Sequence, residues 1–412
     1  MIASLAHGTT RIKNFSTSND CAATRSCLAQ LSVEIEPEGS DLVVHGRGAE
    51  GLRAPREPLD CGNSGTTMRL LAGILAGKNF SSTLTGDESL RSRPMERIIE
   101  PLKMMGANIS SHEGRAPLVI QGRRPLRAIN YELLVASAQV KSCILFAGLG
   151  ANGRTEVTEN ETTRDHTERM LRWFGIPTEV KSGDREGSRV AAIEGPASFN
   201  ARDVSIPGDI SSAAYFIAAA ALLEGSSLEI SNVGLNPTRV LFLNQMQAVG
   251  FDTTIADELE ECGEPVGAVR VQGRHSRPSS DSESLLTLRS AFVPQLIDEL
   301  PLLAVVGSQI EGGIEIRDAA ELRVKESDRI ATTAQGLRAM GADVEEFEDG
   351  LRVSGPTRLR GAKIDPGGDH RMAMTFAVAG LIAKGETEIE DADCVAVSFP
   401  QFFDLLDSVV ER

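Results

Sequence analysis

The stretch IPGDISSAAYFIAAAALLEGSSLEIS, residues 206–231, joins a polar turn, a long apolar run and a short segment of alternating character. Polar residues of this kind precede helices, and a continuous apolar run indicates a helix that is buried on all sides. The alternating segment is typical of a strand. Because AAYFIAAAALL is too short to cross a membrane, we interpret it as a core helix. The stretch therefore predicts a buried helix that leads into a strand.

This pattern recurs along the chain. Strand-like segments begin at residues 9, 81, 153, 225, 312 and 385, at intervals of 72, 72, 72, 87 and 73 residues. A fixed period is the mark of a repeated supersecondary unit. The longer interval contains the polar stretch GRHSRPSSDSES, residues 273–284, which we expect to form an exposed loop.

A second helix follows most of these segments and ends near a glycine, and alternating stretches such as APLVIQG and GLRVSG come after it. Each unit is therefore expected to run helix, strand, helix, strand, strand. Six units in two sets of three predict an α/β protein of two similar domains. We place these domains at residues 1–206 and 207–412, with the boundary near Pro207.

The first unit begins in the middle of the pattern. When MIASLAHGTTRIKN is aligned on its strand with residues 206–231, it supplies only the second half of the helix. The sixth unit stops after FFDLLDSVVER, without closing strands. We therefore expect a segment of about 20–30 residues before Met1, which corresponds to a loop, a helix start and a strand pair of typical length. It would complete the first helix of one domain and the closing strands of the other.

Composition restricts the classes of function. The net charge of −16 argues against nucleic acid or an anionic membrane as a general partner, and one Trp with two Tyr offers little surface for base stacking. The six cysteines are scattered without metal-ligand spacing. We expect reduced thiols, no metal site and a cytoplasmic protein.

Polar residues gather at the start of the first helix of each unit. The stretches are CGNSGTTMR (61–69), SAQVKS (137–142), PGDISS (207–212), LIDELP (296–301) and GGDHRMAM (367–374). Helix N-termini carry unpaired N–H groups and a partial positive charge, which favour phosphate and carboxylate groups. Helix capping alone explains any one of them. As a set with embedded Arg and Lys, they favour an anion-binding site that needs no metal.

Two further segments add charged side chains. GDESLRSRPMER (86–97) holds three arginines, and LRVKESDRI (322–330) brings Lys325, Glu326 and Arg329 together, with Lys325 and Arg329 one helical turn apart. A guanidinium suits phosphate or carboxylate through a two-pronged contact. A carboxylate among cations can serve as an acid or base. Asp298 is a second candidate, for which an N-cap role is equally compatible with the sequence.

At these residues a resemblance becomes specific. GNSGTTMR, GDESLRSRPM, SAQVKS, RDHTERML, PGDISSAA, IDELPLLAV, RVKESDRI, DHRMAM and FPQFF together resemble the motifs of the 5-enolpyruvylshikimate-3-phosphate (EPSP) synthase family, in order and across essentially the whole chain. The resemblance implies the inside-out α/β barrel of the enolpyruvyl transferases, with two domains of three βαβαββ units each. It also implies transfer of the enolpyruvyl group from phosphoenolpyruvate to the 5-hydroxyl of shikimate 3-phosphate, in aromatic amino acid biosynthesis, without metal or cofactor.

The same resemblance implies roles for individual residues. Asp298 would be the base on the 5-hydroxyl, Glu326 with Lys325 would handle the proton at the methylene carbon, and His370 would lie near this acid group. Phosphoenolpyruvate would be held by Gly65, Arg93, Gln139, Arg329 and Arg371. Shikimate 3-phosphate would be held by Ser137, Gln139, Arg164, Asp298 and Lys325. The resemblance also makes glyphosate, the known inhibitor of the family, a candidate ligand, without fixing the sensitivity of this chain, and we expect a monomer.

Two departures from the family pattern affect these expectations. Val397 and Ser398 stand where many members carry a Lys. The family motif PG-(D/S)-KS-x-S-(N/H)-R, which gives a Lys, a Ser and an Arg to the substrates, should stand just before the first residues of this chain. Each lost hydrogen bond to a charged group removes roughly 1.5–3 kcal/mol of binding. We therefore expect little activity from the chain as written and full activity from a longer gene product.

Two alternatives stay open at this point. One is a catalytically impaired remnant that still binds a ligand or a partner. The other is a UDP-N-acetylglucosamine enolpyruvyl transferase, which has the same fold and co-substrate. The mobile loop of that family carries a Cys, and GDESLRSRPM has none.

Overall fold

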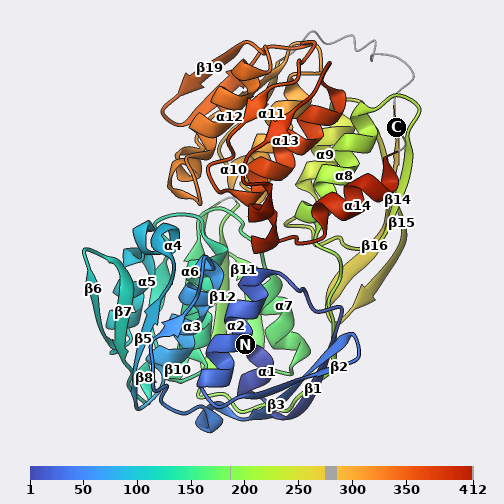
Figure 1. Ribbon diagram of the computed structural model, residues 1–412. Helices are drawn as coiled ribbons and strands as arrows, with labels where there is room; N and C mark the ends of the chain where they lie inside the picture. Colours follow the sequence, from blue (N-terminus) through green and yellow to red (C-terminus); the bar gives the residue numbers. More distant parts are fainter. Residues whose placement is uncertain (186, 274–284, 411–412) are drawn as a thin grey trace. The chain divides into compact units, whose positions relative to one another are not determined.

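The computed structural model describes residues 1–185, 187–273 and 285–410. Two units account for the chain, one made of Met1–Ile206 with Glu261–Glu264 and the other of Pro207–Glu260 with Pro265–Arg412 (Figure 1). The loop expected at 273–284 lies, apart from Gly273, outside the described residues. Within the described part of the chain, no helix combines the length and apolar character that a membrane span needs.

The first unit contains three repeats. The first consists of α1 (Ile2–Leu5), β1 (His7–Lys13), α2 (Asn19–Gln30), β2 (Glu34–Glu38), β3 (Asp41–Arg47) and η1 (Ala49–Gly51). The second consists of β4 (Leu59–Asp60), α3 (Gly65–Ala76), β5 (Ser81–Thr85), α4 (Glu88–Ser92), α5 (Glu96–Met104), β6 (Asn108–His112) and β7 (Arg115–Gln121). The third consists of β8 (Leu126–Arg127), β9 (Asn130–Glu132), α6 (Ala138–Gly148), β10 (Ala151–Glu159), α7 (His166–Trp173), β11 (Thr178–Ser182) and β12 (Arg189–Gly195), and β13 (Val204–Ser205) follows it.

The second unit contains three more. The fourth repeat has α8 (Ile210–Leu222), β14 (Ser227–Gly234), α9 (Leu241–Ala248), β15 (Asp252–Glu261) and β16 (Glu264–Gln272). The fifth has β17 (Leu286–Leu288), α10 (Phe292–Leu296), α11 (Leu300–Gly307), β18 (Ile314–Ile316), η2 (Ala320–Val324), α12 (Arg329–Ala339), β19 (Val344–Phe347) and β20 (Gly350–Val353). The sixth has β21 (Lys363–Ile364), α13 (His370–Ile382), β22 (Glu388–Ile389), η3 (Ala392–Val397) and α14 (Phe402–Val409).

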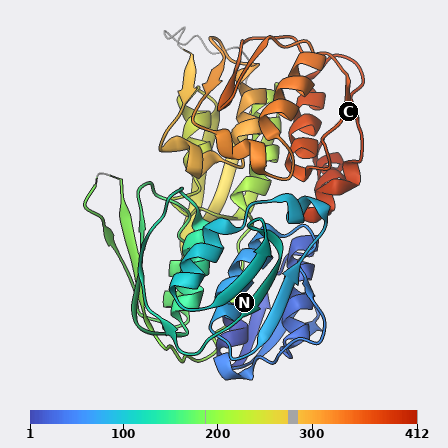
Figure 2. The same cartoon turned by 90° about the vertical axis from the view of Figure 1, so that its left-hand side faces the viewer.

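The sheets repeat one topology. Their strand orders are β13-β1-β3-β2, β4-β5-β7-β6, β8-β10-β12-β11, β14-β16-β15, β17-β18-β20-β19 and β21-β22, and β9 pairs beside β10. In the second repeat, β4 runs parallel to β5 with Leu59 opposite Leu84, while β5 and β6 flank β7 in antiparallel pairs. These βαβαββ units confirm the predicted fold class. Figure 2 shows the hairpin of β11 and β12, in light green, extending away from its repeat.

The fourth and sixth repeats depart from the pattern. In the fourth, the strand that leads into α8 is reduced to a single parallel bridge between Gly208 and Val233. In the sixth, the strand predicted at 385–391 shrinks to Glu388–Ile389, and its sheet has no third strand among the described residues. In both places the segment has few neighbouring strands to pair with. The alternating sequence therefore does not form a longer strand.

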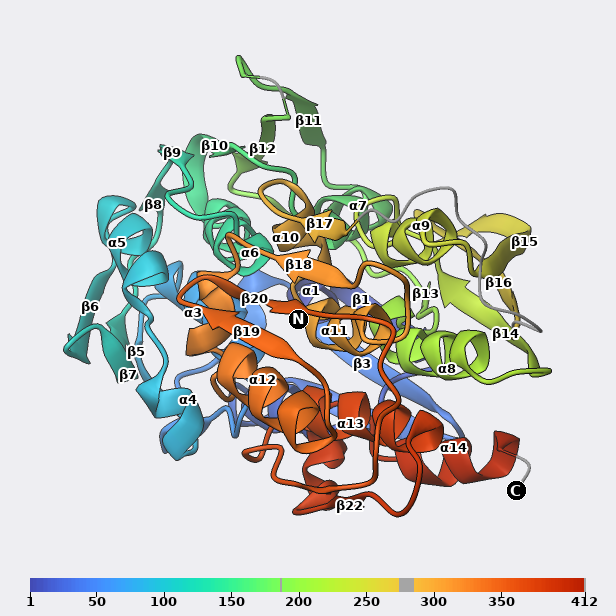
Figure 3. The ribbon, with the colours of Figure 1, turned by 90° about the horizontal axis from the view of Figure 1, so that it is seen from above.

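The first helices of the repeats form the interior of each unit. All eight residues of α11 are buried, and α8, α11 and α13 contact one another and lie side by side in Figure 3. In the first unit α3 packs on α6 so closely that a Cβ on Gly73 would meet the carbonyl oxygen of Cys143. A helix buried on every side needs an apolar run rather than an amphipathic pattern, which explains the sequence of α8. The polar residues are thereby left to the helix N-termini.

Candidate active site

The N-terminus of α3 in the first unit lies beside two guanidinium groups. Ser64 caps the helix by accepting a hydrogen bond from Thr67 N, and Gly65 is the first helical residue. A Cβ on Gly65 would lie 2.8 Å from Nη1 of Arg69 and 3.4 Å from Nη1 of Arg93. A side chain at this position would crowd the Arg69 guanidinium, and its absence lets two cations approach a helix N-terminus, a combination that favours an anion.

Arg93 is held rigidly beside this position. The residue is buried, and its Nη2 donates to Asn63 Oδ1 at 2.7 Å and to Ser89 Oγ at 3.1 Å. Asn63 in turn donates through Nδ2 to Asp87 Oδ2 at 2.7 Å, and Asp87 caps α4. A guanidinium that is oriented before binding loses little rotamer freedom when it meets an anion.

Arg69 connects α3 to the start of α6. Its Nη1 donates to Gln139 Oε1 at 2.6 Å, and Gln139 Nε2 donates to Thr66 Oγ1 at 2.8 Å. Ser137 caps α6 by accepting from Val140 N. The structure thus brings the predicted residues Gly65, Ser137 and Gln139 together. Sequence reasoning assigned no role to Arg69, although it stands in the quoted motif CGNSGTTMR.

Arg164 is half-buried in the turn between β10 and α7, next to the buried Thr163. The following residue, Asp165, occupies the N-cap position of α7 and receives a hydrogen bond from Arg169 Nε at 2.9 Å. The position of Arg164 therefore depends on the contacts that hold this turn.

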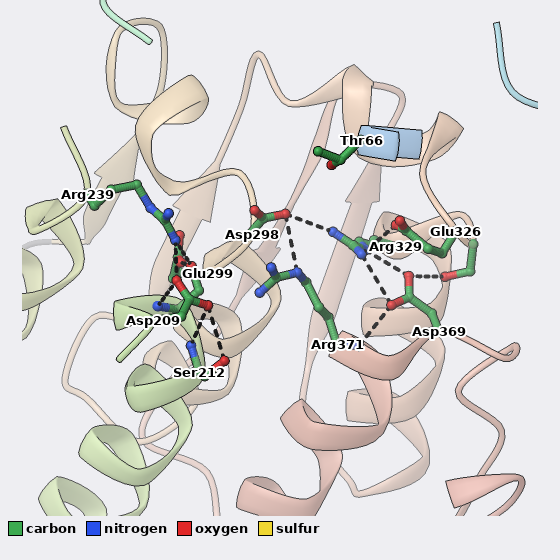
Figure 4. A network of polar contacts seen from close by, with 12 residues as sticks. Thr66, Asp209, Ser212, Arg239, Asp298, Glu299, Glu326, Arg329, Asp369 and Arg371 are labelled. Carbon is green, nitrogen blue, oxygen red and sulfur yellow. Dashed lines mark hydrogen bonds and ion pairs between the residues drawn. The ribbon is translucent and has the colours of Figure 1, made fainter. Parts of the chain in front are cut away.

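Arg329 is the centre of the charged site in the second unit (Figure 4). It is 1 % exposed and donates to three carboxylates: to Asp369 Oδ2 at 2.8 Å, to Glu326 Oε2 at 2.6 Å and to Asp298 Oδ1 at 3.3 Å. Burial opposes the charge of this guanidinium, but the three carboxylates together raise its pKa. An ion-pair cluster of this kind holds its members in fixed orientations.

Asp298 is shared between two arginines. Besides Arg329, it contacts Nε of Arg371 at 3.3 Å. Burial lowers the pKa of Arg371, yet Asp298 and Tyr215 raise it well above its ordinary value. The N-cap interpretation of Asp298 is wrong, because Glu299 occupies the N-cap position of α11. Its carboxylate is therefore committed to the charged site rather than to the helix end.

Lys325 and Glu326 precede α12 rather than lying on it. Lys325 follows the short helix η2, and Asp328 caps α12 by accepting from Ala331 N. The expected spacing of Lys325 and Arg329 by one helical turn is therefore wrong, because the capping Asp328 starts a new helix at Arg329. Burial lowers the pKa of Lys325, while Asp298 acts in the opposite direction.

His370 is the first residue of α13 and is buried. Its Nδ1 has no hydrogen-bond partner among the described residues, and Asp369 caps the helix in front of it. Burial, assisted by the neighbouring Arg371, lowers the pKa of His370 to about 4. The imidazole is therefore neutral at pH 7.

The lowered pKa of His370 predicts that the second unit loses stability as the pH falls. The unfolded chain binds a proton at His370 from pH 6.5 downward, whereas the folded chain does so only near pH 4, so the free energy of unfolding falls between these values. At about 1.4 kcal/mol per pH unit, the loss is about 3 kcal/mol. Denaturant titrations at several pH values should show a shallower acid dependence for His370→Asn. The exposed His112→Asn is the control, and equal slopes for His370→Asn and the unchanged protein would contradict the assignment.

A second polar cluster in the same unit was not predicted. Asp209 caps α8 and accepts from Arg239 Nη2 at 3.0 Å. Ser211 receives a hydrogen bond from Arg239 and donates one to the buried Glu299. Asp209 lies in the quoted motif PGDISS, but Arg239 follows it by 30 residues and gives no local signal. This cluster fixes the starts of α8 and α11 against each other.

Each unit carries its own set of charged groups. The first unit offers cations and helix N-termini for anions, and the second offers two partly exposed carboxylates, Asp298 and Glu326, among cations. Within the described ranges, no cluster of His, Cys, Asp and Glu has the geometry of a metal site. The first set is suited to binding anionic molecules, and the second to moving protons.

Comparisons with known proteins agree with this chemistry. The family model of EPSP synthase (3-phosphoshikimate 1-carboxyvinyltransferase) matches residues 1–406. The 3-phosphoshikimate 1-carboxyvinyltransferase of Koribacter versatilis strain Ellin345 is 50% identical over 413 residues, which span 100% of this chain and 93% of that protein. The enzyme of the same name from Geobacter sp. strain M21 is 45% identical over 414 residues, with coverage of 100% and 93%.

Solved structures give the same picture. The EPSP synthase of Acinetobacter baumannii superposes with a TM-score of 0.83 at 41% identity, over 99% of this chain and 91% of that chain. The enolpyruvyl transferase NikO from Streptomyces tendae superposes with a TM-score of 0.74 at 17% identity, over 99% and 90% of the two chains. The latter likeness concerns the fold alone.

Proposed function

The chain belongs to the EPSP synthase family, and from this premise we infer that it transfers the enolpyruvyl group of phosphoenolpyruvate to the 5-hydroxyl of shikimate 3-phosphate, with release of phosphate. The observation that carries this conclusion is the match to relatives of one name over the whole chain. The reaction is a step of the shikimate pathway toward aromatic amino acids. The names of these relatives argue against the alternative of a UDP-N-acetylglucosamine enolpyruvyl transferase.

We assign phosphoenolpyruvate to cationic groups of both units. In the first unit these are Arg93 and the backbone at Gly65, with Gln139 beside them, and the support is the close approach of the Arg93 guanidinium to the helix N-terminus at Gly65. In the second unit they are Arg371 and Arg329. A guanidinium has five N–H donors, and Arg329 uses four of them in hydrogen bonds to carboxylates. We assign the fifth, on Nη1, to an oxygen of the ligand.

We assign shikimate 3-phosphate to Ser137, Gln139 and Arg164 in the first unit and to Asp298 and Lys325 in the second. The 5-hydroxyl oxygen adds to the central carbon of phosphoenolpyruvate and its proton passes to Asp298, while Glu326, protonated before this step, gives its proton to the methylene carbon. The ionised Glu326 then removes a proton from the new methyl group as the C–O bond to phosphate breaks, which gives the enol ether. The proton held by Asp298 leaves with the phosphate, so both carboxyl groups return to their starting states. The ion pairs of Asp298 with Arg329 and Arg371 support its role as an ionised base.

The test of this function is a coupled assay with purified protein. Release of phosphate and formation of the enol ether should depend on both phosphoenolpyruvate and shikimate 3-phosphate. Replacement of shikimate 3-phosphate by UDP-N-acetylglucosamine should abolish the signal. Binding of both substrates without product would instead favour the impaired remnant, and the measured rate would test the low activity expected from the sequence.

The assignment of Arg93 makes a further prediction. Arg93→Lys keeps the charge but loses the fork of donors that Asn63 and Ser89 orient. A hydrogen bond between charged groups contributes about 1.5–3 kcal/mol, so KM for phosphoenolpyruvate should rise about 10- to 100-fold. Arg91→Lys changes an exposed arginine of the same segment and should leave KM unchanged. Equal KM values for the two variants would show that Arg93 does not bind phosphoenolpyruvate.

We further propose that the protein is a cytoplasmic monomer inhibited by glyphosate. Each of the six cysteines is a free thiol, which suits a reducing compartment. The Arg93 guanidinium close to the helix N-terminus at Gly65 is suited to the phosphonate of glyphosate. Sedimentation velocity tests the monomer, and competition of glyphosate with phosphoenolpyruvate tests the inhibition.

A further inference from the structure

Three charged side chains are buried together in the first unit. Lys141, on α6, is fully buried and lies 3.0 Å from Glu159 Oε2 and 2.7 Å from Glu168 Oε1. The side chains of both glutamates are at most 3 % exposed. None of the three belongs to the residues assigned to substrates. Burial of an ion cluster carries a large desolvation cost, and in proteins the replacement of such a cluster by apolar side chains of similar volume is often neutral or stabilising.

The cluster joins three elements. Lys141 is on the first turn of α6, Glu159 is the last residue of β10, and Glu168 is on α7. A further link runs parallel to it, because Ser142 Oγ and Thr167 Oγ1 are 2.6 Å apart. The bonds have fixed directions, so they set the angle and the register between these elements rather than only their distance.

Glu159 connects the cluster to the turn that carries Arg164. Its Oε2 accepts hydrogen bonds from Thr163 Oγ1 at 2.6 Å and from Thr163 N at 3.3 Å. Thr163 is buried and directly precedes Arg164. At the other end of the cluster, Lys141 N donates to Ser137 O at 3.1 Å within the turn that holds Gln139. Hydrogen bonds of Lys141 and Glu159 thus link Ser137 to Thr163, the residue before Arg164.

We propose that the Lys141–Glu159–Glu168 cluster is a positioning device that holds Arg164 in register with the start of α6 for the binding of shikimate 3-phosphate. This inference rests on the proposed function, since it takes Ser137, Gln139 and Arg164 as ligands of that substrate. The cluster itself does not touch the substrate. Its effect is to deliver a guanidinium and a helix N-terminus to two parts of one anionic molecule without reorganisation on binding.

Thr163→Val tests the positioning role directly. The replacement keeps the volume and leaves the ion pairs of Lys141 intact, but it removes the hydroxyl that ties the turn to Glu159. Calorimetry should show a dissociation constant for shikimate 3-phosphate at least 5-fold higher, with Tm within a few degrees of the unchanged protein. Amide exchange at residues 160–165 should accelerate. A dissociation constant and exchange rates equal to those of the unchanged protein would overturn the proposal.

Lys141→Met is the second variant, and Lys78→Met is its matched control. Lys78 is also a buried lysine of the first unit, but it donates to Ala49 O, outside the cluster. Both variants should lower Tm, and only Lys141→Met should weaken binding of shikimate 3-phosphate, at least 10-fold at a temperature where both proteins are folded. Equal affinities of the two variants would overturn the proposal. If the unchanged folded protein bound no shikimate 3-phosphate, the proposed function would fall first and this inference with it.

Discussion

Asp298→Asn should lower kcat by a factor of about 10² to 10⁴, the range that general acid–base catalysis contributes. Asparagine keeps the shape of the side chain and can still accept a hydrogen bond from Arg329 or Arg371, but it cannot accept the proton of the 5-hydroxyl. KM for phosphoenolpyruvate should change little. Steady-state kinetics with both substrates, supported by calorimetry with shikimate 3-phosphate, would separate lost chemistry from lost binding.

Asp349→Asn is the matched control for this change. Asp349 is likewise a carboxylate of the second unit paired with an arginine, since Arg317 Nε lies 3.0 Å from its Oδ1. It stands outside the set of residues assigned to substrates, so its loss should leave kcat within about two-fold of the unchanged enzyme. A kcat for Asp298→Asn that matched this control would exclude Asp298 as the base.

Arg329→Met should destabilise the second unit by about 3–5 kcal/mol, because it leaves the carboxylates of Asp369, Glu326 and Asp298 without their central cation. Asp369 is fully buried and cannot recover its hydration. Its oxygen Oδ1 would keep only the backbone N–H of Arg371, at 2.9 Å. Chemical denaturation followed by circular dichroism would measure the loss, and enolpyruvyl transfer should fall with it because Asp298 and Glu326 lose their orientation.

Two variants make this prediction specific. Arg352→Met removes a half-exposed arginine paired with Glu315, and its cost should stay below about 1 kcal/mol. The double variant Arg329→Met with Asp369→Asn removes the most buried unpaired charge and should recover part of the stability without activity. A loss no larger for Arg329→Met than for Arg352→Met would mean that the cluster contributes nothing to the fold.

Most of the fold was predictable because its signals are local. The helix of residues 206–231 and the period of about 72 residues depend on the order of apolar and polar side chains along one segment, and the structure confirms α8 and β14 there. The strand at 385–391 is the weak case, since only Glu388–Ile389 is extended. A strand needs a paired neighbour to persist, and the alternating pattern by itself does not supply one.

The residue types of the candidate site were also visible in the sequence, because anion-binding residues stand in short motifs at helix starts. Their partners were not. Arg69 reaches Gln139 over 70 positions, Arg329 reaches Asp369 over 40, and no local pattern connects them. Lys141 lies in a quoted motif, yet its burial between two glutamates was unforeseen. The period and the motifs were therefore set by the sequence alone. The pairing of buried charges was decided by the tertiary structure, because only packing brings distant segments together and excludes water from them.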